Sequence, residues 1–485
     1  MPIVNEPIVL IKRLRDGSEG RQDFRLSVSS PSFSSRRDAM TKILMSFATV
    51  VLMSGTLRAE DEIPVGWTAE SPRHEVRPQF QWDVSDGTSK GRLLIRADDR
   101  EGLVGAWTRT IPVDGEKHYR FSVERQTEGV TLPRRTGVAR IVWLTESGEK
   151  TTRAEPSYLS YRPGEKPRAE PEFPKHVSTH NGWDRIEGVY LAPPDATQAK
   201  IELCFRWGEP HSLVRWTVPI MEVTDAPEPR TVHLATVHWR PIAGKTAKEK
   251  REQFAPLIAD AAKQGADLIV LPETLTYYRT AGTYADAAET IPGPSTDYFS
   301  QLAKQHDTYI VAGLLERDGH LVYNVAVLLG PEGTIIGKYR KVTLPRGEIE
   351  GGIMPGNEYP VFETRFGKVG MMVCYDGFFP EVARELSNRG AEVIAWPVWG
   401  CNPLLASARA CENHVFLVSS TYTDFGEDWA QSAIYGRDGK TIAHAEDWGT
   451  VSIAEVDLKK PWYWQSLGDF RSQIQAHRPV IDPVP

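Results

Sequence analysis

The hydrophobic pattern of this chain changes character at a short proline-containing segment, residues 226–230. Before it, apolar and polar residues alternate with a period of two in many short runs, as around Tyr119 and Phe121. After it, short apolar runs alternate with segments of helical period. We therefore expect two domains joined by this linker: an all-β sandwich of jelly-roll type over residues 60–225, and an α/β domain over residues 231–458.

In the second half, apolar runs typical of buried strands alternate with amphipathic segments typical of helices. The helical pattern is clearest over residues 254–262, and Gly265 follows it where a C-terminal cap belongs. This alternation implies a sheet whose apolar face is covered by helices. A tryptophan-rich tail, residues 459–485, is expected to pack on a neighbouring surface, of this chain or of another subunit. The predicted strands are 232–237, 267–271, 309–315, 322–329, 334–337, 393–396, 415–420, 432–435 and 450–456, and the other predicted helices are 297–306, 381–389 and 403–413.

The N-terminal region has the pattern of a targeting sequence. Residues 43–57 are apolar and uncharged, follow several basic residues, and are shorter than a membrane span. We interpret residues 1–59 as a leader containing a signal peptide, so we expect an exported protein, periplasmic or extracellular. Met1 and Met40 are both candidate starts.

Composition narrows the possible functions. The 485-residue chain has a net charge of −7, which gives no electrostatic reason to expect a nucleic-acid partner. Its four cysteines are too few and too scattered for a disulfide framework and lack the paired spacing of a zinc site. The sequence also lacks phosphate-binding, dinucleotide-binding and zinc-protease motifs. We expect no cofactor and no metal.

One cysteine lies at the end of an apolar strand, a position that suits a catalytic nucleophile. An apolar run, residues 369–373, ends at Cys374, and a helical pattern begins a few residues later. Backbone N–H groups of such a turn can stabilise an oxyanion, and a helix N-terminus favours the thiolate over the thiol. A single buried cysteine is more often inert than reactive, so this interpretation depends on two further segments.

These segments also place a reactive side chain at or just after the end of an apolar strand. They are Leu-Ile-Val-Leu-Pro-Glu273 and Gly-Lys-Tyr-Arg-Lys341-Val-Thr-Leu-Pro, followed along the chain by Met-Met-Val-Cys374-Tyr-Asp. In this order and at these separations, the chain resembles the nitrilase (carbon–nitrogen hydrolase) superfamily, whose mark is a Glu-Lys-Cys triad. The resemblance covers about residues 231–458. It implies an amidase-like or N-carbamoyl amidohydrolase-like enzyme that acts on a small-molecule amide or carbamoyl substrate.

The chemistry of the three side chains agrees with that resemblance. A Cys374 thiolate can attack an amide or nitrile carbon and form a thioester. In a mostly apolar pocket, Glu273 can act first as general base and then as general acid. Lys341 can stabilise the oxyanion, with the backbone N–H of Tyr375 as a second donor.

The resemblance also implies supporting residues near the triad. A second glutamate follows the lysine in many relatives. Glu348 fits that place and Glu350 is the alternative. Asp376 is expected to orient the turn rather than to perform chemistry. Trp399 borders the substrate pocket by resemblance, and simple core packing is an equal alternative for it.

For the fold, the resemblance implies an αββα sandwich, in which two sheets pack between layers of helices, and a homodimer. The N-terminal domain loosely resembles jelly-roll carbohydrate-binding modules, so a glycan is a further candidate partner. The alternative functions are an exported glycan-binding protein with a degenerate hydrolase domain, and a true nitrilase.

Overall fold

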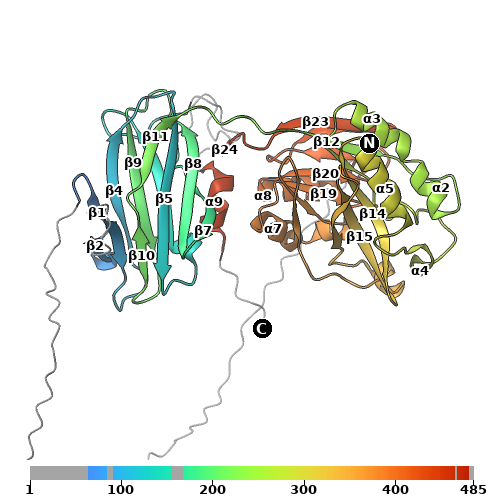
Figure 1. The fold of residues 1–485 in the computed structure, drawn as a ribbon, viewed down its shortest axis with the longest axis horizontal. Coiled ribbons are helices and arrows are strands. Elements are labelled where there is room, and N and C mark those ends of the chain that lie inside the picture. Colours follow the sequence, from blue (N-terminus) through green and yellow to red (C-terminus); the bar gives the residue numbers. More distant parts are fainter. Residues whose placement is uncertain (1–63, 85–90, 154–167, 465–466, 480–485) are drawn as a thin grey trace, which may run out of the picture. The chain divides into compact units, whose positions relative to one another are not determined.

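The computed structural model describes residues 64–84, 91–153, 168–464 and 467–479 (Figure 1). The predicted leader lies outside these residues. Within them, no helix is both long enough and apolar enough to cross a membrane.

The first part of the described chain is a β-sandwich (Figure 1). One antiparallel sheet has the strand order β1-β4-β9-β6, and the other has the order β2-β3-β10-β5-β8-β7, with β11 paired to β5. The predicted all-β architecture is confirmed, while its jelly-roll class stays a prediction. The strands are β1 Thr68–Glu70, β2 Gln79–Asp83, β3 Arg92–Arg96, β4 Val104–Pro112, β5 His118–Glu128, β6 Gly137–Leu144, β7 Lys175–His180, β8 Trp183–Leu191, β9 Gln198–Arg206, β10 Leu213–Trp216 and β11 Ile220–Thr224.

The period-two pattern explains how this sandwich forms. In β5, Tyr119, Phe121 and Val123 are buried between the sheets. Of the residues on the opposite face, Arg120 and Glu124 are exposed and Ser122 is half-buried. Successive side chains of a strand point to opposite faces, so this alternation lines one face of the strand with apolar residues.

The second part contains two six-stranded sheets. The first has the order β16-β15-β14-β13-β12-β23, and the second has the order β17-β18-β19-β20-β21-β22. Strands β12, β13 and β14 are parallel to one another, as are β18, β19 and β20. The first sheet comprises β12 Thr231–His238, β13 Leu268–Val270, β14 Tyr309–Asp318, β15 Leu321–Leu329, β16 Ile335–Arg340 and β23 Thr450–Asp457. The second comprises β17 Val361–Glu363, β18 Lys368–Met371, β19 Val393–Pro397, β20 Phe416–Ser420, β21 Ala433–Tyr435 and β22 Thr441–His444.

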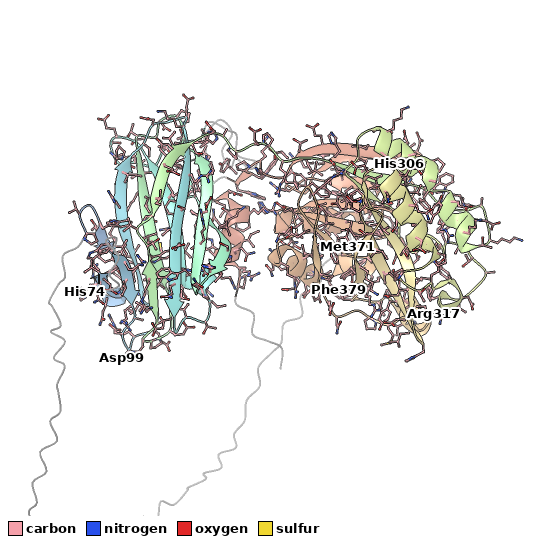
Figure 2. All side chains as sticks on the ribbon, viewed as in Figure 1. His74, Asp99, His306, Arg317, Met371 and Phe379 are labelled. Carbon is pink, nitrogen blue, oxygen red and sulfur yellow. The ribbon has the colours of Figure 1, made fainter. Side chains whose placement is uncertain are left out.

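Four helices cover the outer faces of these sheets (Figure 1). Helices α3 (Ala255–Lys263) and α5 (Pro294–Gln305) pack on the first sheet, with Ile258 and Phe299 in that layer of the core. Helices α7 (Pro380–Asn388) and α8 (Pro403–Asn413) pack on the second sheet. Between the sheets lies a separate apolar layer that includes Met371, labelled in Figure 2. The predicted αββα sandwich is confirmed.

Sequence periodicity missed the short elements because none is long enough to show a period. A local signal existed for two of them: Thr246 and Glu249 form a capping box at the start of α2, and Thr283 and Asp286 form one at the start of α4. The short elements are η1 His74–Val76, α1 Pro133–Thr136, α2 Ala247–Glu252, α4 Tyr284–Ala287, α6 Arg346–Glu350 and η2 Cys374–Phe378, together with strands β17 and β22.

The tail folds into a two-stranded pair, β24 Tyr463–Trp464 and β25 Gly468–Asp469, and a helix, α9 Phe470–His477. The His477 ring meets the Phe173 ring edge-on at 5.2 Å, and Ala476 belongs to a small apolar cluster with Val138. The tail therefore packs on residues of its own chain.

Gly313 in β14 lets two backbone segments approach closely. A Cβ at this position would lie 2.5 Å from the Pro272 carbonyl oxygen and 2.6 Å from the Glu273 Cα, so the backbone would have to move. We expect Gly313→Ala to lower the free energy of unfolding by about 1–3 kcal/mol, as overpacking does. The measurement is the thermal unfolding midpoint by circular dichroism.

The matched control is Gly347→Ala in α6. Nothing lies within 4 Å of a Cβ added there, and alanine favours helix. Equal midpoints for the two variants would contradict the expected strain at Gly313.

Candidate active site

The three predicted catalytic segments converge where the two sheets face each other. Glu273 follows β13 and Lys341 follows β16, both in the first sheet. Cys374 follows β18 of the second sheet and begins the 3₁₀ turn η2. Segments far apart in the chain thus bring a carboxylate, an ammonium and a thiol to one place.

Lys341 is the centre of this cluster. Its Nζ donates to Glu273 Oε1 at 2.9 Å and to Glu348 Oε1 at 2.7 Å. All three side chains are buried, with relative exposures of 0% for Lys341, 2% for Glu273 and 8% for Glu348. The Nδ2 of Asn324 on β15 donates to the same two carboxylate oxygens, at 2.7 Å and 3.1 Å. Each carboxylate therefore accepts from an ammonium and from an amide.

The charged groups in this cluster shift one another's pKa values. Burial by itself lowers the pKa of Lys341, but the charges of Glu273 and Glu348 outweigh it and hold that pKa well above its usual value. Burial raises the pKa of Glu348 to about 7, with Lys341 opposing the rise and Glu273 adding to it. Lys341 is thus a permanent cation, and Glu348 exchanges its proton near neutral pH.

Backbone contacts hold Cys374 in an uncommon conformation. Its φ of 40° lies in the left-handed region, which a non-glycine residue adopts only where its surroundings impose it. The indole Nε1 of Trp396 donates to the Cys374 carbonyl at 3.2 Å, and Cys374 Sγ lies 3.5 Å from the Gly400 carbonyl oxygen. Arg409 Nε donates to the Gly377 carbonyl at 3.2 Å, which fixes the turn from the other side.

The thiol is not activated in the way that the sequence suggested. Burial, then the negative charge of Glu273, raise the pKa of Cys374, and Lys341 offsets only part of the rise. The expected thiolate at a helix N-terminus is wrong, because η2 is a short 3₁₀ turn and the α7 helix begins only at Pro380. Cys374 therefore rests as a thiol, and a base must remove its proton.

Asp376 joins the lysine segment to the cysteine turn. Its buried carboxylate accepts from Tyr339 Oη at 2.8 Å, from the Thr343 N–H at 3.0 Å and hydroxyl at 2.6 Å, and from the Val373 N–H at 2.9 Å. Burial raises its pKa and these donors oppose the rise. Asp376 thus orients the turn, as we expected, and ties together segments of both sheets.

The remaining predicted residues surround this cluster. Glu350 is exposed and pairs with Arg346, so the geometry favours Glu348 over Glu350 as the second glutamate. Tyr375 follows Cys374 in η2, and its ring packs against Phe378 and against Phe379, labelled in Figure 2. Trp399 is 42% exposed, so its side chain does not simply fill the core.

Sequence reasoning missed two residues that contact Glu273. Asn324 is the single amide in the apolar strand β15, and a buried polar residue of this kind is a usable signal. The Tyr422 hydroxyl donates to the Glu273 carbonyl at 2.8 Å, and nothing in its local pattern marks it. Across the described ranges, no group of three or more His, Cys, Asp or Glu side chains is arranged to hold a metal ion.

Comparison with known proteins gives consistent matches to this region. The carbon-nitrogen hydrolase family model matches residues 241–461. An omega-amidase NIT2-A of Xenopus laevis is 32% identical over 245 residues, which are 46% of this chain and 86% of that protein. A nitrilase of Pyrococcus abyssi is 40% identical over 216 residues, which are 42% of this chain and 81% of that protein. Among solved structures, Saccharomyces cerevisiae Nit3 is 24% identical, with a TM-score of 0.44, and the match covers 52% of this chain and 96% of that chain.

The bonds of Asp376 generate a stability prediction. Asp376→Ala would leave the Tyr339 hydroxyl, the Thr343 groups and the Val373 N–H without their buried acceptor. We expect a loss of at least about 3 kcal/mol in the free energy of unfolding, since each unsatisfied buried donor costs about 1–3 kcal/mol. Chemical denaturation followed by circular dichroism measures it.

Glu350→Ala is the control, because an exposed ion pair contributes little. If Asp376→Ala were no less stable than Glu350→Ala, the proposed tie between the two sheets would be wrong.

Proposed function

This chain belongs to the carbon–nitrogen hydrolase family, and on that premise we propose that Cys374, Glu273 and Lys341 hydrolyse a carboxylic amide through a thioester. The observation that carries the proposal is the buried ammonium of Lys341, held between Glu273 and Glu348. The same ammonium and the Glu273 carboxylate both shift the pKa of the Cys374 thiol, so all three groups act on one another.

The first half of the reaction makes the thioester. As the Cys374 sulfur attacks the amide carbon, Glu273 takes the thiol proton, which the raised pKa of Cys374 makes necessary. The carbonyl oxygen gains negative charge and is stabilised by the Lys341 ammonium and the Tyr375 backbone N–H. Glu273 then gives its proton to the nitrogen, the C–N bond breaks, and ammonia or an amine leaves.

The second half returns the enzyme to its starting state. Glu273 takes a proton from water as the water oxygen attacks the thioester carbon. The second oxyanion uses the same two donors. When the C–S bond breaks, the proton on Glu273 returns to the sulfur, and the carboxylic acid product leaves.

Glu348 acts as a positioning residue for Lys341. Its Oε1 accepts from Nζ at 2.7 Å, which restrains the rotation of the ammonium. A charge-assisted hydrogen bond of this kind is about twice as strong as a neutral one.

We favour an amide over a nitrile as the substrate because several of the matched relatives are omega-amidases. One is a nitrilase, so nitrile hydrolysis is the second candidate. Export of the chain, a homodimer and glycan binding by the sandwich stay predictions from the sequence. Cell fractionation, analytical ultracentrifugation and a glycan array on the full chain would test them.

Substitution of the nucleophile tests the proposal. Cys374→Ala should abolish ammonia release from a panel of primary amides, because no thioester can form, and should leave the circular dichroism spectrum unchanged. Cys204→Ala, which removes a buried cysteine of the sandwich, is the control and should retain activity. Undiminished ammonia release by Cys374→Ala would exclude the mechanism.

The titration of Glu348 generates a pH prediction. Below its pKa of about 7 the Glu348 carboxylate takes up a proton, and its bond to Lys341 loses the attraction between opposite charges. We expect kcat/KM to fall about tenfold as the pH drops through 7, the effect of about 1.4 kcal/mol. The measurement is kcat/KM between pH 5 and pH 9.

Glu348→Gln should show lower activity and no inflection near pH 7, since its amide carries no charge at any pH. Glu350→Gln should keep the wild-type profile. An inflection that persists unchanged in Glu348→Gln would assign the titration to another group.

A further inference from the structure

Aromatic rings connect the buried cluster to the molecular surface. The Tyr422 ring, whose hydroxyl donates to the Glu273 carbonyl, packs against the Tyr278 ring with centroids 4.4 Å apart. Both rings contact Trp399, at 5.1 Å from Tyr278 and 5.2 Å from Tyr422. Tyr278 and Tyr422 are buried, whereas 42% of Trp399 is exposed.

A second exposed indole lies beside the same segment. A Cβ added to Gly400 would lie 3.3 Å from the six-membered ring of Trp429, and Ala430 N–H donates to the Cys401 carbonyl at 2.6 Å. Trp429 is 49% exposed. Because the Gly400 carbonyl oxygen contacts Cys374 Sγ, Trp399 and Trp429 border the backbone that contacts the nucleophile.

On the other side of the cysteine the site is closed. Lys341, Asn324 and Glu348 surround the Glu273 carboxylate, and Tyr422 covers its backbone. All of them are buried. A nitrogen that takes its proton from Glu273 must enter this corner, where an N-substituent has little room.

We infer that the substrate is a primary amide whose acyl part carries a flat, apolar group that packs on Trp399 and Trp429. The inference rests on the proposed function. The nitrogen leaves as ammonia from the closed corner, while the acyl part stays on the Cys374 sulfur and extends toward the exposed indoles. Exposed aromatic surface next to a nucleophile is stabilised by covering it with another apolar ring.

The competing occupant is an acyl chain that ends in a carboxylate. Its partner would be Arg279, whose side chain is exposed and whose guanidinium lies 5.6 Å from the Tyr278 ring centre. The experiment must therefore separate an aromatic from an anionic acyl group.

The test compares four amides with the full chain: 3-phenylpropanamide, its N-methyl derivative, butyramide and glutaramate. We expect 3-phenylpropanamide to have the highest kcat/KM and the N-methyl amide to react at least about 100-fold more slowly. Trp399→Ala and Trp429→Ala should each raise KM for 3-phenylpropanamide by about tenfold, the size of one lost aromatic contact, with kcat little changed. The KM for butyramide should rise much less than that for 3-phenylpropanamide, and Trp399→Phe should recover most of the affinity.

Trp207→Ala is the matched control, because Trp207 belongs to the sandwich region and is 52% exposed. It should leave every substrate unchanged. Preference for glutaramate, lost in Arg279→Gln, would overturn the inference and leave the proposed hydrolysis standing. Equal rates for the N-methyl and primary amides would also overturn it.

A binding measurement separates failure of the inference from failure of the proposed function. If no amide released ammonia, the proposed hydrolysis would be wrong. Calorimetric titration of the Cys374→Ala protein would then decide the inference by itself: 3-phenylpropanamide should bind at least about tenfold more tightly than glutaramate, and Trp399→Ala should remove the difference. Equal binding of the two compounds would overturn it.

Discussion

The arrangement of this domain depends on the ion pairs that the Lys341 ammonium forms with Glu273 and Glu348. A buried charge without partners costs several kcal/mol, and the fully buried Lys341 has anionic partners at hydrogen-bond distance. Glu273 and Glu348 supply these partners from two separate segments. The Asn324 amide on β15 also donates a hydrogen bond to each of the two carboxylates. Burial of Glu348, and then the negative charge of Glu273 beside it, raise the pKa of Glu348 to about 7 although Lys341 opposes the rise. The cluster is thus both a packing constraint and a place where one proton is readily exchanged.

Asp376 extends this constraint to the second sheet. Tyr339 belongs to β16, Thr343 follows Lys341, and Val373 precedes the nucleophile, and all three donate to the Asp376 carboxylate. A shift of one sheet relative to the other would break several of these bonds together. Gly377 also helps to fix the turn after Cys374. A Cβ at this position would lie 2.3 Å from the Trp396 ring, so only a glycine lets the turn lie this close to the indole. The same indole donates to the Cys374 carbonyl. The distance between thiol and ammonium is therefore set by buried polar contacts rather than by flexible loops.

The sequence was informative where a single segment contains its own signal. Long apolar runs and helical stripes predicted most strands and helices, and helix α8 was predicted with its observed bounds, Pro403–Asn413. Glu273, Lys341 and Cys374 were expected to meet because their three segments together resemble one family, and the structure places the charges of Glu273 and Lys341 close enough to shift the pKa of Cys374. Their catalytic roles stay a prediction. Contacts between distant segments could not be predicted in this way. The bond of the Tyr422 hydroxyl to the Glu273 carbonyl joins residues 149 positions apart, and no local period encodes it. The protonation state of Cys374 could not be predicted for the same reason, since burial and the charge of Glu273 are properties of the folded site.

That protonation state explains how such a cysteine can remain usable. A thiolate is the form that oxidants and disulfides attack, so a permanently ionised cysteine is vulnerable in an oxidising compartment, which the sequence predicts for this chain. Here the thiol keeps its proton because burial and Glu273 disfavour the thiolate. In the proposed mechanism, the proton leaves toward Glu273 when a carbonyl carbon is in place to accept the sulfur and the Lys341 ammonium is in place to stabilise the resulting negative charge. In that mechanism, the carboxylate that disfavours the thiolate at rest is also the base that removes the thiol proton during the reaction.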